Sequence, residues 1–153
     1  MTPRQADRYR VALHEAAHAV AAADLGLHCE FVTLVPKKGA LAFMRHTALT
    51  TRALNVARGG DNAFAHVARA DAIADFAGPA VELLVFGASK FARADVASAT
   101  RSARVSGIPL LELQLEAERL ARKRLQAINL VARKLEQHRT LSGAAVALLA
   151  RQR

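Results

Sequence analysis

The first 25 residues of the chain carry its clearest pattern of hydrophobic and polar positions. Apolar side chains recur there at intervals of three and four residues, at Tyr9, Leu13, Ala16, Val20 and Ala23. This spacing places them on one face of an α-helix. Thr2, Pro3 and Gln5 form a capping box with proline at the first helical position, and Gly26 is a typical stop signal. We therefore expect a buried helix that runs to about Leu25.

The pattern changes in residues 30–46, where β-branched and aromatic residues flank a segment that runs from Pro36 to Gly39. β-branched residues favour strands, whereas proline and glycine favour turns, so this stretch predicts a β-hairpin. Residues 47–60 have mixed polarity and end in two glycines. This composition predicts a loop.

Helical spacing returns after residue 60. Asp61 is expected to cap a second helix that extends to Gly87. Because proline has no N–H to donate and clashes with the preceding turn, Pro79 predicts a kink or break in that helix. A third helix carries Asp95 and is expected to end at Gly107.

The last part of the chain, residues 108–153, predicts a pair of helices. Pro109 should open one long amphipathic helix that continues to about His138, and Thr140 or Ser142 should start a short final helix. Together these elements predict a mainly α fold of the α+β class, with a small β hairpin or sheet beside the first helix.

Composition limits the size and setting of the fold. The 153 residues suffice for one domain, 1–153, and 52% hydrophobic but only 5% aromatic residues indicate a core of small aliphatic side chains at close helix contacts. Apolar runs fall short of the ~20 residues that span a bilayer, and the N-terminus has no apolar signal core. Cys29 is the only cysteine, so no internal disulfide can form. We therefore expect a cytoplasmic protein without a membrane segment.

The net charge of +9 is compatible with nucleic acid, an anionic surface or an acidic partner. The excess lies in the last third of the chain, mostly at the solvent-facing spacing of a helix. No aromatic residues alternate with these cations to stack bases. We therefore interpret them as a solvated face and do not expect nucleic acid as a partner.

The most specific chemical signal is the H-E-x-x-H pattern of His14, Glu15 and His18. On a helix the two histidines lie one turn apart on one face, so both can bind a single zinc ion while Glu15 lies beside it as a general base. The pattern also occurs by chance on exposed helices. A catalytic zinc needs a third protein ligand, for which Glu82 and Asp95 are the candidates.

Further segments of the chain resemble a known family in the same order. Residues 13–20, 32–36 (VTLVP) and 39–41 (GAL) resemble the peptidase domain of the FtsH family, the M41 metallopeptidases, with its H-E-A-G-H helix, V-T-I-I-P strand and A-L-G strand. Residues 77–87 and 94–104 are similar to its G-G-R-x-A-E-E-x-x-x-G and S-N-D-x-x-x-A-T-x-x-A-R segments, and residues 114–149 to its terminal helix pair. In that family the aspartate of the S-N-D segment is the third zinc ligand, which implies Asp95.

The resemblance implies a helical zinc-peptidase domain, with the zinc site in residues 1–107 and the helix pair in residues 108–153. The implied activity is that of a zinc endopeptidase in which His14, His18 and Asp95 bind Zn²⁺ and Glu15 removes a proton from the attacking water. Glu82 could hold a ligand histidine through a hydrogen bond or simply pair with an arginine. The residues expected to hold an extended substrate by strand addition are Ala40, Leu41, Ala42, Phe43 and Met44.

The chain also departs from the family. Ala17 replaces its usual glycine, Pro79 its arginine and Leu83 the second glutamate of its pair. No G-x-x-x-x-G-K-[ST] motif is present, so the ATPase module of the family is missing. We therefore expect cleavage of unfolded or flexible polypeptides that does not itself need ATP. The expected partners are a separate ATPase or unfoldase and, by resemblance, further copies in a hexameric homo-oligomer.

An alternative from another class is a non-catalytic helical adaptor. Its zinc site would be structural or vestigial, and its basic C-terminal half would bind a partner. The presence of His14, Glu15, His18 and Asp95 together favours the enzyme, because loss of activity would first release Glu15 from constraint.

Overall fold

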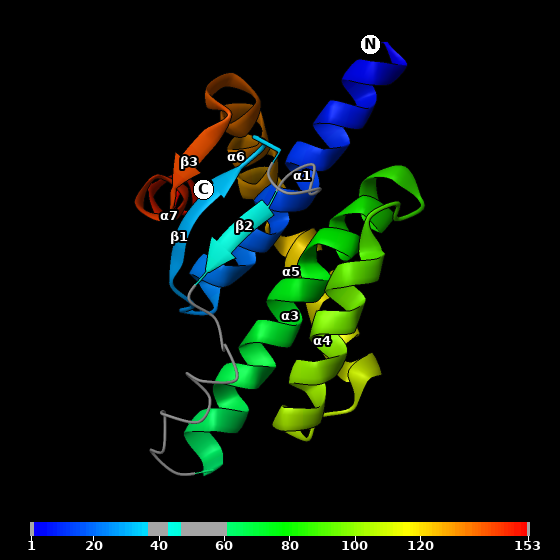
Figure 1. The fold of residues 1–153 in the computed structure, drawn as a ribbon, viewed down its shortest axis with the longest axis vertical. Coiled ribbons are helices and arrows are strands. Elements are labelled where there is room, and N and C mark those ends of the chain that lie inside the picture. Colours follow the sequence, from blue (N-terminus) through cyan, green and yellow to red (C-terminus); the bar gives the residue numbers. More distant parts are fainter. Residues whose placement is uncertain (1, 37–42, 47–60, 153) are drawn as a thin grey trace.

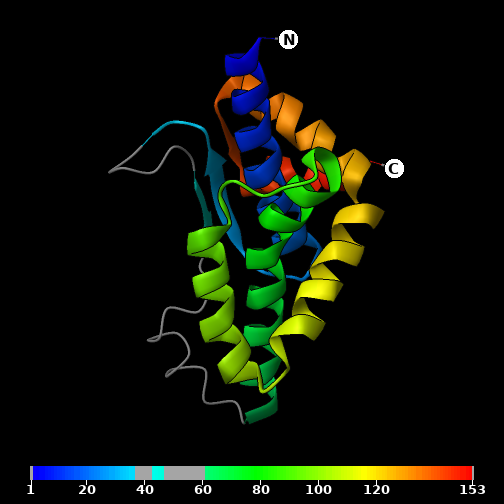
Figure 2. The same ribbon diagram turned by 90° about the vertical axis from the view of Figure 1, so that its right-hand side faces the viewer.

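Six helices and a small antiparallel sheet form the described part of the chain (Figures 1 and 2). The computed structural model describes residues 2–36, 43–46 and 61–152. In chain order the elements are α1 (Pro3–Asp24), β1 (Cys29–Thr33), β2 (Phe43–His46), α3 (Asp61–Phe86), α4 (Ala92–Ser106), α5 (Leu110–Lys123), α6 (Leu125–His138), β3 (Thr140–Ser142) and α7 (Gly143–Ala150). The predicted mainly α fold with a small sheet beside the first helix is confirmed.

Helix α1 lies at the centre of the molecule and begins as the sequence predicts. Oγ1 of Thr2 accepts a hydrogen bond from the backbone N–H of Gln5, whose side chain accepts one from the N–H of Thr2. The helix ends just before Gly26, whose φ of 73° suits a residue without a side chain. Residues 12–22 are almost entirely buried, because α1 packs against α3 on one side and α6 on the other.

The sheet has the strand order β2-β1-β3, and both pairings are antiparallel. Val32 pairs with Met44 and Thr33 with Phe43, which confirms the predicted pairing for the strand residues that the structure describes. The third strand was not predicted. Thr140 in β3 pairs with Thr33, and their hydroxyl oxygens lie 2.7 Å apart. The sequence before the last helix is thus an edge strand that ties the C-terminal part to the sheet.

Helix α3 runs from Asp61 to Phe86 without the break that Pro79 predicts. A proline inside a helix removes one intrahelical hydrogen bond. Helix α3 packs against α1, α4 and α5 along its length, and this packing holds the turns on both sides of the proline in one helix. Its start at Asp61 and the end of α4 before Gly107 agree with the sequence.

The predicted long C-terminal helix is in fact two helices, α5 and α6, that are separated at Arg124. Arg124 has non-helical backbone angles, with φ −105° and ψ 11°. Its guanidinium donates to Oδ1 of Asp24 at 3.2 Å and to the carbonyl oxygen of Ala150. The change of direction lets α5 pack on α3 while α6 packs on α1. Ser142 caps the final helix, as predicted.

Small aliphatic side chains fill the core, as the composition indicates. The buried cluster is mostly alanine, with Leu13, Val20, Ile73 and Leu135 among its larger members. Alanine lets helix backbones approach closely, and α1 and α3 are in extensive contact. In the part of the chain that the structure describes, no helix is long and apolar enough to cross a membrane.

Candidate metal centre

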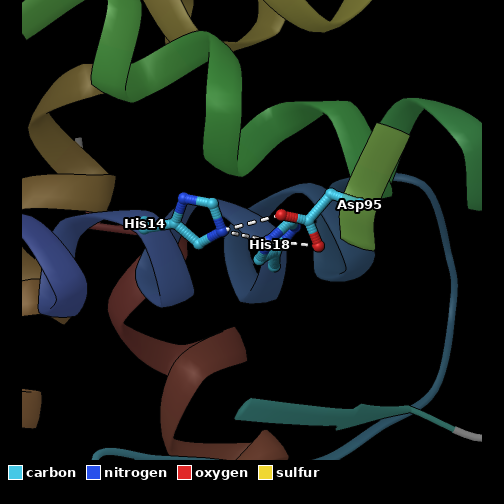
Figure 3. A group of neighbouring side chains, drawn as sticks. All are labelled: His14, His18 and Asp95. Carbon is cyan, nitrogen blue, oxygen red and sulfur yellow. Dashed lines mark hydrogen bonds and ion pairs between the residues drawn. The ribbon is translucent and has the colours of Figure 1, made fainter. Parts of the chain in front are cut away.

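The two histidines of the H-E-x-x-H pattern point from α1 towards α3 and α4 (Figure 3). His14 and His18 are 4% and 6% exposed, and their Nε2 atoms lie 3.0 Å apart. They share a face because residues four apart on a helix lie one turn apart. The prediction that both imidazoles can reach one point is therefore met by the geometry.

Asp95 reaches the same point from the first turn of α4 (Figure 3). Its Oδ2 lies 3.0 Å from Nε2 of His14 and its Oδ1 lies 3.5 Å from Nε2 of His18. The ligand atoms of all three residues lie within 4.8 Å of one another. Atoms bound to one tetrahedral zinc at 2.0–2.1 Å lie about 3.3 Å apart, so these spacings suit a zinc ion.

The other ring nitrogens of the histidines fix which atoms can bind a metal. Nδ1 of His14 lies 2.7 Å from Oε1 of Glu82, and Nδ1 of His18 lies 2.7 Å from the carbonyl oxygen of Ala74. Because a carbonyl or an ionised carboxylate only accepts, each Nδ1 carries the hydrogen. In neutral rings both Nε2 lone pairs then face each other and the carboxylate of Asp95. Three converging acceptors need a cation among them, either protons on the rings or a metal ion.

Gly78 brings the backbone of α3 directly against the two imidazoles. A Cβ atom at this position would lie 2.5 Å from Nε2 of His18 and 2.7 Å from Nε2 of His14. Carbon and nitrogen do not approach so closely without a bond, and both rings are held in place at Nδ1. The absence of a side chain on Gly78 thus lets α3 pack against both rings without displacing them, and the donor set of two imidazoles and one carboxylate fits a zinc ion.

The electrostatic field at this point favours positive charge. Burial opposes a charged ring, but the contact with Asp95 and the charges of Asp95 and Glu15 raise the pKa of His18 to about 10. The pKa of His14 is raised as well, against its burial, by Asp95 and Glu82. Although burial acts in the opposite direction, the two histidines hold the pKa of Asp95 well below its usual range. A divalent cation would benefit from the same field.

Glu82 supports the centre from α3, and its side chain is fully buried. It accepts hydrogen bonds from Nδ1 of His14 at 2.7 Å, Nε of Arg10 at 2.5 Å, the backbone N–H of Lys90 at 2.9 Å and the hydroxyl of Ser89 at 3.2 Å. Burial disfavours its charge, yet these donors lower the pKa of Glu82 to about 2. From the sequence, the partner of Glu82 could be either a ligand histidine or an arginine. In the structure Glu82 contacts one of each, His14 and Arg10.

Glu15 follows His14 in α1 and is also buried, at 8% exposure. Its charge contributes to the raised pKa of His18, and helical spacing places it on the same side of α1 as His18. A buried carboxylate next to a metal site can exchange protons with water bound there. The position of Glu15 is therefore compatible with the predicted general base.

The predicted substrate strand is only partly described. Ala40, Leu41 and Ala42 lie outside the described residues, whereas Phe43 and Met44 begin β2. Within the described sheet β2 is an edge strand, since its neighbour β1 lies between β2 and β3. An edge strand can accept an added strand through its backbone groups.

Sequence reasoning assigned no role to Gly78, Arg10, Ala74 or Asp75. Gly78 lay within a matched motif, but only packing shows which atoms its missing side chain would meet. Asp75, one turn before it, is largely buried. Burial first and then the charge of Asp71 raise the pKa of Asp75 to about 7. Besides Asp95 and Glu15, a further carboxyl thus interacts electrostatically with His18 and is protonated below about pH 7.

The resemblance to the FtsH peptidases rests on the residues quoted above. No family model and no curated protein matches the chain. Membership of that family therefore stays a prediction, and the chemistry of the site is argued from its geometry.

Proposed function

We propose that the chain is a zinc-dependent endopeptidase that cleaves extended or unfolded polypeptides. The observation that carries the proposal is the convergence of His14, His18 and Asp95, whose ligand atoms lie within 4.8 Å of one another. Two neutral imidazoles and a carboxylate form a ligand set of catalytic zinc sites, which leave a fourth position for water or substrate. Glu15 lies next to that set on the same helix.

Each residue has a defined task in this proposal. His14, His18 and Asp95 hold the ion, and Glu82 fixes the ring of His14 through Nδ1. When bound, zinc supplies Lewis acidity that activates water and stabilises negative charge on the peptide carbonyl. Glu15 accepts the proton of the attacking water and then delivers it to the nitrogen of the leaving amine.

The substrate must present its backbone to the sheet. The edge strand β2 supports addition of an extended peptide, which a folded substrate cannot supply. The sequence contains no phosphate-binding motif of the G-x-x-x-x-G-K-[ST] type, so we propose cleavage that is independent of ATP. Only the resemblance to the FtsH family supports a separate unfoldase and a hexameric assembly.

Replacement of Glu15 by glutamine tests the function directly. The variant keeps the size of the side chain and should bind about one zinc per chain. Its rate of cleavage of unfolded casein should be lower by about 10²–10⁴-fold or more, because the general base is lost. Zinc is measured by elemental analysis and cleavage by release of labelled peptides. Equal rates for wild type and variant would assign the activity to a contaminant.

The alternative, a non-catalytic adaptor, is supported by exposed cations on α5 and α6, among them Arg119, Arg122 and Arg133. It predicts zinc retention without cleavage in both wild type and the Glu15→Gln variant. Failure of the wild-type protein to cleave several unfolded substrates at full zinc occupancy would favour this alternative.

A further inference from the structure

A groove of about 900 Å³ lies next to the metal centre. One wall is the N-terminal half of α1, and the others are the end of β1 with the residues after it and the segment that leads into α4. Figure 2 shows this last segment, between α3 and α4, crossing the N-terminal half of α1. The groove therefore shares α1 and the start of α4 with the elements that position the ligands, and residues after β1 and Arg139 complete it.

The groove and the centre share one face of α1. Arg4, Arg8 and Val11 line the groove, and Glu15 and His18 continue the same spacing of three and four residues. Helix geometry thus aligns the groove with the proposed base and one ligand.

A second contact joins the groove to the centre from the other side. The ring of Phe91, which also lines the groove, packs edge to face on the ring of His14, with centroids 6.0 Å apart. The groove and the metal centre therefore adjoin at Phe91.

Cations dominate the polar lining. Arg4, Arg8, Lys90 and Arg139 line the groove together with the single carboxylate of Asp7. Nζ of Lys90 lies 3.1 Å from Oδ1 of Asp7, which neutralises one of the four cations. Nη2 of Arg139 donates to the carbonyl oxygen of Leu34, which leaves the arginine charge without a counter-ion. The side chains of Arg4 and Arg8 make no ion pair or hydrogen bond with other described residues.

We propose that this groove is a subsite for an acidic side chain of the extended substrate. This proposal rests on the proposed peptidase function. Its unpaired cations complement a carboxylate, and apolar Val11, Leu34 and Phe91 suit the aliphatic stem of glutamate or an apolar neighbour. A single aromatic ring offers little for successive bases to stack on, so the occupant is a polypeptide and not a nucleic acid.

Helix geometry gives the position of the acidic residue in the substrate. Arg8 and Arg4 precede Glu15 by seven and eleven residues, which is roughly 10 and 16 Å along the helix axis. An extended peptide covers these distances in about three to five residues. The preferred carboxylate should therefore lie about three to five residues from the cleaved bond.

The first arm of the test measures cleavage of matched peptides. Each pair of quenched fluorescent peptides differs only by Glu or Gln at one position, three to five residues from the scissile bond, on either side. At one of these positions, kcat/KM should be roughly three- to tenfold higher for Glu, as expected for contact with one or two partly exposed cations. The preference should shrink at high salt.

The second arm compares two double variants with the same change in net charge. Arg4→Gln with Arg8→Gln should remove the preference for Glu, so that the two peptides are cleaved equally. Arg119→Gln with Arg122→Gln alters exposed residues of α5 outside the groove and should keep the preference. Circular dichroism shows that each variant is folded.

The third arm measures binding without cleavage, by fluorescence anisotropy of the same peptides on the zinc-loaded Glu15→Gln variant. Tighter binding of the Glu peptide, together with no cleavage by wild type, would sustain the subsite and refute the peptidase. Cleavage with equal kcat/KM for Glu and Gln at every position would refute the subsite alone. A preference that survives in the Arg4 and Arg8 variant, or displacement of the peptide by an equimolar oligonucleotide, would also overturn it.

Discussion

The two faces of helix α1 both pack against other helices but differ in how they are held. One face carries Tyr9, Leu13 and Val20 and packs against α6, where the hydroxyl of Tyr9 also bonds to Asn129. The opposite face carries His14 and His18 and meets α3 and α4 through directional contacts.

This difference separates stability from chemistry. On the apolar face, the stabilisation from dispersion and burial changes gradually with side-chain volume. Side chains of similar shape are therefore tolerated there. On the polar face each contact is a hydrogen bond between two particular atoms, for example Nδ1 of His14 and Oε1 of Glu82. Substitutions on the apolar face should thus change the free energy of unfolding, and those on the polar face should change metal binding. The following predictions are ordered by their expected effect on zinc.

The largest effect on zinc is expected for Gly78→Ala. Its Cβ would lie 2.5–2.7 Å from both Nε2 atoms and would displace the rings from the positions in which they converge with Asp95. Zinc content should fall from about one per chain to near zero, whereas alanine favours a helix over glycine by up to about 1 kcal/mol and should preserve α3. Elemental analysis and a thermal melt check both points. Full zinc occupancy in a folded variant would show that zinc binding does not depend on the close approach of α3 to the two rings.

Asp95→Asn should also lose the metal while it keeps a similar shape. It removes the negative charge of the third ligand, so the affinity should fall by more than the about 10–100-fold expected for loss of a supporting contact. Arg101→Gln, a change at an exposed position further along α4, serves as a control for the helix. Competition with a zinc chelator measures the affinity, and equal affinity in Asp95→Asn and wild type would mean that the third ligand is another residue.

Glu82→Gln should weaken zinc by about 10–100-fold, because the carboxylate that holds His14 loses its charge. It also leaves Arg10 buried beside a neutral partner, and loss of one partner of a buried pair destabilises by roughly 3–5 kcal/mol. Chelator competition and urea unfolding separate the two effects. A stability unchanged from wild type would argue that the contact with Arg10 is not made in solution.

Leu13→Ala should have the smallest effect on zinc. Leu13 is fully buried on the apolar face, so truncation should lower the free energy of unfolding by about 2–5 kcal/mol. The folded fraction should still bind one zinc with wild-type affinity, as measured by chelator competition below the melting temperature. A large loss of affinity would show that the two faces of α1 are coupled.

The part of the site that lies within one helix was predictable from the sequence. His14, Glu15 and His18 take their relative positions from the helical repeat, and the capping box of Thr2 and Gln5 fixes where that helix begins. Asp95 is 77 residues after His18 in the sequence, and local pattern could only offer it beside Glu82 as a candidate. The resemblance, not the periodicity, selected it.

The sequence by itself determined the features that have local causes. These are helix α1, the pairing of β1 with β2, the ends of α1 and α4 at Gly26 and Gly107, and the start of α7 at Ser142. Tertiary packing decided the rest. The separation of α5 from α6, the continuity of α3 through Pro79 and the third strand depend on neighbours far along the chain. The need for glycine at position 78 likewise arises only because α3 packs closely on α1, since a missing side chain matters only where another element faces it.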